Sequence, residues 1–235
     1  MSIMEFFTNP YFLIALTFVV FVGAQYLQRL TGIKLLNPIL VSVAVMICLL
    51  CGLGVDYETY EEGGEYIDFW LKPAVVALGV PLYRQLGSIK RQIMPLLMAE
   101  TAGCLMGLVS VIAVAKLFGA SREIIISLAP KAVTTPIAIE ISNATGGLPA
   151  LTAAVVVCTG IFGSIAGFKI IKMSRIRSIE SSGLSIGTAA HAMGTSAAME
   201  RDDTCGAFSS LGLILNGLLT ALFAPYILHL MGCAI

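Results

Sequence analysis

Residues 129–147 read APKAVTTPIAIEISNATGG, and this stretch decides which kind of fold the chain can adopt. It lies among long apolar segments, yet it holds two prolines, a lysine, a glutamate and two adjacent threonines. An uninterrupted lipid-facing helix does not tolerate that combination, because proline removes a backbone donor and charged side chains are costly in hydrocarbon. We therefore predict a broken helix, with the break at residues 130–134.

The break has the features of an anion-binding site. Pro136 fits the first position of a new helical turn, which makes Thr135 the predicted N-cap. A half-helix that begins inside a membrane protein presents free N–H groups and the positive end of its dipole to the gap. Lys131 adds a formal charge, although it can instead reach an interface or pair with Glu140. We predict that the substrate is bound here by Lys131, Thr134, Thr135 and Pro136.

The pattern recurs sixty residues later, where HAMGTSAAME at 191–200 aligns with KAVTTPIAIE at 131–140. The alignment matches Lys131 with His191 and Thr135 with Thr195. Paired interrupted segments are the best sequence pointer to a transporter site, since each contributes one half-helix end to a shared cavity. The predicted substrate-binding set therefore also includes His191, Gly194, Thr195 and Asn216.

Three ionisable residues in these segments are candidates for proton coupling, namely His191, Glu140 and Glu200. Histidine titrates near neutral pH, which suits a group that gains and loses a proton in each cycle. The alternatives stay open, because a histidine in an apolar segment is often a hydrogen-bonded core residue and the two glutamates can be interfacial.

The composition indicates an all-α polytopic protein of the lipid bilayer. Hydrophobic residues make up 57% of the chain and charged residues 12%, with a mean hydropathy of +0.92. Fourteen basic and fourteen acidic residues give a formal net charge of zero, so no basic field for nucleic acid is present. The sequence contains no recognisable nucleophile motif, phosphate loop or metal-spaced cluster, so we predict no enzyme, catalytic residue, metal or cofactor.

Six apolar runs have about the 20 residues needed to cross the hydrocarbon core of a bilayer. They cover residues 10–28, 36–55, 69–86, 93–117, 149–171 and 205–231. Basic residues follow the first, third and fifth runs, whereas residues 56–68 between the second and third are acidic, so the basic loops are predicted to be cytoplasmic.

This rule constrains the two broken segments. If residues 122–143 crossed the membrane completely, the basic cluster at 169–177 would lie outside. A re-entrant segment removes the conflict. This requires that residues 183–200 also form a re-entrant segment, which enters the membrane from the cytoplasmic side and returns to that side. We therefore predict about six full transmembrane helices plus two broken or re-entrant helices that form an inverted-topology repeat. In this single membrane domain, 1–235, residues 1–117 are supporting helices and 122–171 and 183–231 are the inverted units.

Several motifs resemble the LrgB/CidB family. They are PKAVTTPIAIE at 130–140, GTAAHAMGT at 187–195, GAFSS at 206–210 with NGLLT at 216–220, LNP at 36–38 and PAVVALGVPLY at 73–83. The resemblance covers nearly the whole chain. Ala132 and Ala189 stand where the family pattern has serine, which are small changes.

The resemblance implies two functions. One is a holin-like or antiholin-like regulator of murein hydrolase activity and cell lysis. The other is a carrier of small carboxylates such as pyruvate, glycolate or glycerate. It also implies a bacterial inner (plasma) membrane location, a small LrgA/CidA-type membrane partner and a homo-oligomer. The broken helices favour the carrier, because opposed half-helix ends bind an anion directly, whereas a lysis pore does not need them.

Overall fold

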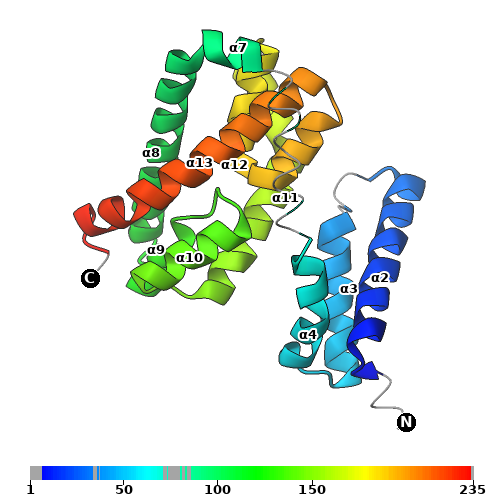
Figure 1. Ribbon diagram of the computed structural model, residues 1–235. Helices are drawn as coiled ribbons and strands as arrows, with labels where there is room; N and C mark the ends of the chain where they lie inside the picture. Colours follow the sequence, from blue (N-terminus) through cyan, green and yellow to red (C-terminus); the bar gives the residue numbers. More distant parts are fainter. Residues whose placement is uncertain are drawn as a thin grey trace. The chain divides into compact units, whose positions relative to one another are not determined.

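The computed structural model describes residues 7–33, 36, 38–70, 73, 80, 83 and 86–233, and regular structure within these ranges is helical. The chain divides into two compact units, residues 1–78 and 79–235 (Figure 1). Within the described ranges, four helices are long and apolar enough to cross a membrane. The predicted all-α, multi-pass membrane protein is therefore confirmed at this level. Most of the span predicted at 69–86 lies outside the described residues.

The first unit consists of α2 (Pro10–Thr31), α3 (Pro38–Leu53) and α4 (Tyr57–Asp68). Asn9 caps α2 by accepting a hydrogen bond from the Tyr11 amide at 2.9 Å. The acidic stretch between the second and third predicted spans forms α4, which packs on α2, where the Thr17 and Tyr60 hydroxyl oxygens lie 3.1 Å apart. With 16 residues, α3 is shorter than a typical span.

The second unit contains α7 (Leu86–Arg91), α8 (Ile93–Leu117), α9 (Arg122–Leu128), α10 (Thr135–Thr145), α11 (Pro149–Met173), α12 (Ile179–Met199) and α13 (Asp203–Leu230). The three long helices α8, α11 and α13 match the spans predicted at 93–117, 149–171 and 205–231. The pair α9–α10 connects the end of α8 to the start of α11, and α12 connects the end of α11 to the start of α13. Because α11 has 25 residues, these two connections lie at opposite ends of the unit (Figure 1).

The α9–α10 pair is a short helical hairpin with a non-helical tip at residues 129–134. Ser121 caps α9, and α10 ends at Gly146, whose φ of 84° suits glycine. Ser127 accepts a hydrogen bond from the Leu148 amide at 2.7 Å, which ties α9 to the start of α11. This interruption is the one that the proline-rich stretch predicted.

A second hairpin is formed within α12, where His191 has a non-helical φ of 43° and ψ of −138°. A Cβ placed on Gly194 would lie 2.9 Å from the carbonyl oxygen of Ile186. In a straight helix these residues would be about 12 Å apart along the axis, given a rise of about 1.5 Å per residue. The half after His191 therefore folds back over the half before it.

Glycines let the α12 hairpin contact its neighbours at backbone distance. Cβ atoms on Gly183 and Gly187 would overlap the backbone of Cys205 and Ser209 on α13, and one on Gly212 would lie 2.6 Å from the Leu184 carbonyl oxygen. On the other side of α12, Gly163 of α11 faces Ala190. Small residues that allow such approach are typical of helix packing in membranes. We call the α12–α13 contact the glycine seam.

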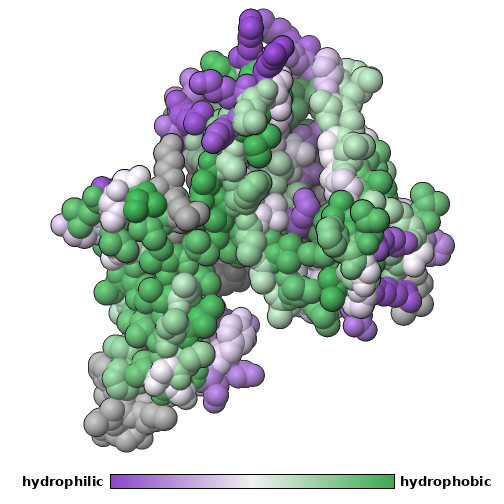
Figure 2. All heavy atoms as spheres, turned by 180° about the vertical axis from the view of Figure 1, so that it is seen from behind, coloured by the Kyte–Doolittle hydropathy of each residue, from purple (hydrophilic) through white to green (hydrophobic). Residues whose placement is uncertain are grey.

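Basic residues gather at one end of the second unit. The C-terminal end of α11 and the helix α7 are at the same end of the unit in Figure 1, and Figure 2 shows hydrophilic side chains at that end. Lys90 and Arg91 end α7, and Lys172 lies in the last turn of α11. The two basic loops therefore share one side of this unit, as the positive-inside rule requires.

Candidate functional site

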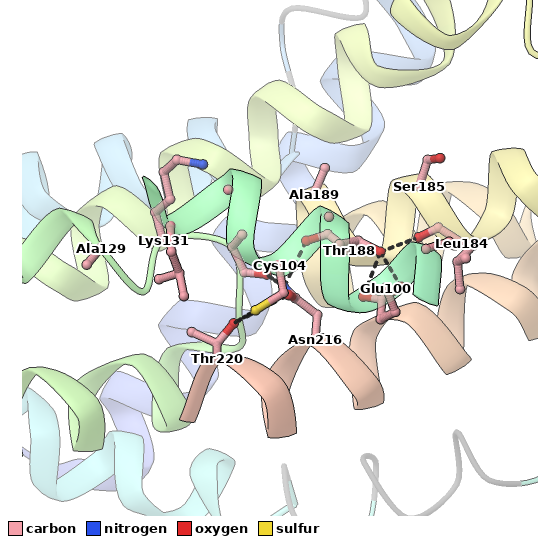
Figure 3. Close-up of a pocket in the computed structure, with 15 residues that line it drawn as sticks. Glu100, Cys104, Ala129, Lys131, Leu184, Ser185, Thr188, Ala189, Asn216 and Thr220 are labelled. Carbon is pink, nitrogen blue, oxygen red and sulfur yellow. Dashed lines mark hydrogen bonds between the residues drawn. The ribbon is translucent and has the colours of Figure 1, made fainter. Parts of the chain in front are cut away.

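A cavity of about 310 Å³ lies between α8, the α9–α10 tip, α12 and α13 (Figure 3). Most of its wall is made of small or apolar side chains. The lining residues with polar side chains are Glu100, Cys104, Lys131, Ser185, Thr188, Asn216 and Thr220. A concave space with a few convergent polar groups is the usual form of a small-molecule site.

Asn216 joins the two hairpins. Its Nδ2 donates to the carbonyl oxygen of Ala132 at 3.0 Å and to that of Thr188 at 2.9 Å. Ala132 lies in the α9–α10 tip and Thr188 lies in α12 just before its break. The two interruptions, separated by sixty residues in sequence, therefore meet at one buried amide on α13.

The break at His191 explains why Thr188 needs this partner. In a continuous helix the Thr188 carbonyl would accept the amide of Ala192, four residues later. The non-helical dihedrals at His191 redirect the chain, and a buried carbonyl without a partner would be costly. Asn216 supplies the hydrogen bond. Both protons of its amide are used in this way, so its role is to hold the cavity walls.

Lys131 lines the cavity, as its position in the break predicted, and its side chain is half-buried. No hydrogen bond connects its ammonium group to the other residues drawn in Figure 3. A lysine in this position can offer its charge to a bound anion.

Glu100 of α8 is a cavity residue that sequence reasoning missed. It is 1% exposed, and the Thr188 hydroxyl oxygen lies 2.8 Å from each of its carboxyl oxygens (Figure 3). The available signal was its position as the one acidic residue within the apolar run 93–117. Ionisable residues inside such runs are rare and usually functional.

His191, Gly194 and Thr195 are buried but are not among the residues that line this cavity. The His191 Nε2 atom lies 3.0 Å from the Val156 carbonyl oxygen of α11. Gly160 makes room for the ring, because a Cβ there would lie 2.6 Å from the His191 Cε1 atom. Thr195 donates to the His191 carbonyl at 3.0 Å and lies 3.0 Å from the Ser209 hydroxyl.

The N-cap predicted at Thr135 is wrong, and Thr195, which the alignment matches with it, is not a cap either. The N-cap of α10 is Thr134, with extended dihedrals and no side-chain capping bond, so Thr135 is the first helical residue and Pro136 follows it. Proline is tolerated throughout the first turn, so its position alone does not set the register. Thr195 lies inside the second half of α12 and bonds back to His191, which an N-cap does not do.

The two glutamates predicted for proton coupling are both exposed. Glu140 lies on α10 and Glu200 follows the last residue of α12, and neither lines the cavity. Of the predicted substrate-binding set, the structure places Lys131 and Asn216 in the cavity wall. Thr134, Thr135 and Pro136 lie beside it in sequence but are outside that wall.

Comparisons with a family model and with individual known proteins both give matches over most of the chain. The model of the LrgB-like family matches residues 17–230. Holin-like protein CidB of Staphylococcus epidermidis (strain ATCC 35984) is 34% identical over 93% of this chain and 95% of its own length. Holin-like protein CidB of Staphylococcus aureus (strain Mu50) is 33% identical over 97% and 99%, and YxaC of Bacillus subtilis (strain 168) is 35% identical over 93% and 95%. No solved structure matches. With these matches over nearly its whole length, the chain belongs to the LrgB-like family.

Proposed function

We propose that the chain is a secondary transporter for small 2-oxo or 2-hydroxy monocarboxylates, such as pyruvate, glycolate or glycerate, in the inner membrane of a bacterium. The observation that carries the proposal is the cavity where both interrupted helices meet, with Lys131 in its wall. A single cation among mostly small and apolar side chains selects a small anion with one negative charge. The helix α10 begins four residues after Lys131, and the free N–H groups of its first turn favour a negative charge nearby.

The order of elements supports this function. The same order of elements occurs in residues 122–171 and 183–231: a short helix, a break, a second short helix and one long helix. The two hairpins lie at opposite ends of the unit. We propose that these are the inverted-topology units and that substrate binds where their tips meet, as in transporters built from such repeats. Alternating access then exposes the cavity to one side of the membrane at a time.

Loss of Lys131 tests the function. We expect purified wild-type protein in proteoliposomes, together with its small membrane partner, to take up labelled pyruvate or glycolate saturably. Lys131→Met should lower that uptake about thirtyfold or more, because removing one member of a buried charge pair costs about 2 kcal/mol or more. Lys172→Met is the matched control, since Lys172 is exposed at the end of α11 and should leave uptake unchanged. Equal uptake by the Lys131→Met and wild-type proteins would contradict the proposal.

The second candidate is a holin-like or antiholin-like regulator of murein hydrolase activity and lysis. It is favoured by the name holin-like protein CidB that two of the similar proteins carry. For this function the protein would form a homo-oligomer and act with an LrgA/CidA-type partner. Such a pore would release many unrelated solutes from loaded vesicles, whereas a carrier gives saturable flux that only one class of carboxylate inhibits.

A further inference from the structure

The carboxyl group of Glu100 has no direct role in binding an anion, because a negative charge in the cavity would repel it. Glu100 is nonetheless 1% exposed and faces the same cavity as Lys131. A buried carboxylate that only filled space would be costly, and leucine or glutamine would fill the position without that cost. Its presence therefore needs a reason of its own.

Thr188 can serve Glu100 in both protonation states. Its hydroxyl oxygen lies 2.8 Å from both carboxyl oxygens and 2.7 Å from the Leu184 carbonyl oxygen. A hydroxyl has one proton to donate and can also accept. When Glu100 is ionised, Thr188 donates to it. When Glu100 is protonated, it donates to Thr188, whose own proton then turns to Leu184. The same heavy-atom geometry thus accommodates proton gain and loss.

The charges in the cavity link the proton to the anion. With Glu100 protonated, Lys131 gives the cavity one net positive charge, which one monocarboxylate neutralises. With Glu100 ionised, the cavity is already neutral, and an added anion leaves an uncompensated charge in a medium of low dielectric constant. Cys104 is the other titratable group in the cavity wall, and its Sγ lies 3.3 Å from the Thr220 hydroxyl oxygen. The lining residues of α12 and α13 are uncharged.

A series of hydrogen bonds leads from Glu100 to the backbone beside Lys131. Thr188 touches Glu100 through its hydroxyl, and its carbonyl accepts from Asn216. The same Asn216 amide holds the carbonyl of Ala132, the residue after Lys131. These hydrogen bonds therefore run from the acid through both interrupted helices to the backbone of the residue that follows the cation in sequence.

We propose that Glu100 binds the coupling proton, so that one proton and one monocarboxylate move together. This inference rests on the proposed transport function and adds its coupling ion. The proton adds to the Glu100 carboxylate on one side of the membrane and leaves it on the other, and no other reactant is consumed. Because one positive and one negative charge move together, the cycle transfers no net charge.

Two assays in proteoliposomes test the assignment with labelled pyruvate. The first measures exchange at equal pH on both sides, and the second measures accumulation with an acidic exterior. In wild-type protein, a gradient of about one pH unit should drive about tenfold accumulation for one-to-one symport. Glu100→Gln imitates the protonated acid, so we expect exchange to persist and accumulation to be lost. Glu123→Gln, at an exposed carboxylate of α9, should behave like wild type.

The outcomes separate the two proposals. Exchange by wild type together with full accumulation by Glu100→Gln overturns the role of Glu100 and leaves the transport function intact. If Glu140→Gln or Glu200→Gln loses accumulation while Glu100→Gln keeps it, the coupling proton is bound by that other glutamate, and the role of Glu100 is overturned. Absence of any wild-type exchange overturns both proposals.

A second variant, Glu100→Asp, tests the assignment if the Glu100→Gln protein cannot be incorporated into proteoliposomes. Glu100→Asp keeps the acid but draws it away from Thr188, so accumulation should persist with a shifted pH of half-maximal uptake. An unchanged pH profile in Glu100→Asp overturns the assignment.

Discussion

Gly187→Ala is expected to destabilise the protein by about 3 kcal/mol, the upper part of the usual range for overpacking a tight contact. The added Cβ would overlap the backbone of Ser209, and backbone cannot rotate away as a side chain can. The glycine seam would have to separate along its length, because Gly183 and Gly212 approach the opposite backbone in the same way. The midpoint of thermal unfolding in detergent, followed by loss of the monodisperse peak in gel filtration, measures the effect.

The control is Gly23→Ala in α2, where a Cβ would meet no atom within 4 Å. Helix propensity alone makes alanine better than glycine by about 1 kcal/mol, so this variant should match or exceed wild-type stability. The two substitutions are chemically identical and are predicted to act in opposite directions. A Gly187→Ala protein as stable as wild type would contradict the packing described for α12 and α13.

Asn216→Leu should have an effect of similar size, about 3 kcal/mol, for a different reason. Leucine has nearly the same size but no donor, so the carbonyl oxygens of Ala132 and Thr188 would both lose their partner. Each orphaned buried acceptor costs about 1–3 kcal/mol. We expect a lower unfolding midpoint and, because the two hairpins are no longer joined, at least a tenfold loss of carboxylate uptake, the factor that about 1.4 kcal/mol produces.

Asn143→Leu is the matched control, since Asn143 is exposed on α10. It should leave both the unfolding midpoint and the uptake unchanged. If Asn216→Leu lowered uptake without changing stability, Asn216 would have to contact the substrate itself, as the sequence first predicted.

The membrane-spanning helices could be predicted from the sequence, because they depend on the length of an apolar run. The spans α8, α11 and α13 are long apolar runs, and the break before α10 follows from two prolines and a lysine in one stretch. The helix α4 is not predictable in the same way, because six acidic residues within 56–68 leave no apolar run, and its packing against α2 depends on a tertiary contact. The division of the chain into supporting helices and inverted units stays a prediction.

The site was predictable only in part, because cavity walls depend on tertiary contacts. Lys131 was found since a cation in a broken helix is conspicuous. Glu100 was not predicted, because a single carboxyl group hardly changes the mean hydropathy of a 25-residue apolar run. The alignment with 131–140 predicted an interruption at 191–200, but the turn at His191 uses a positive φ, which is uncommon outside glycine, so no propensity rule fixes its position.

The two hairpins differ in how freely each can shift. The α12 hairpin meets α13 backbone to backbone, which leaves little room for one to shift against the other. The α9–α10 hairpin meets α8 and α13 through side chains such as Ile125, Ile126 and Ile141, which can exchange rotamers. If the protein is the carrier proposed above, we therefore expect the α9–α10 hairpin to be the element that moves and α12 with α13 to be its fixed frame.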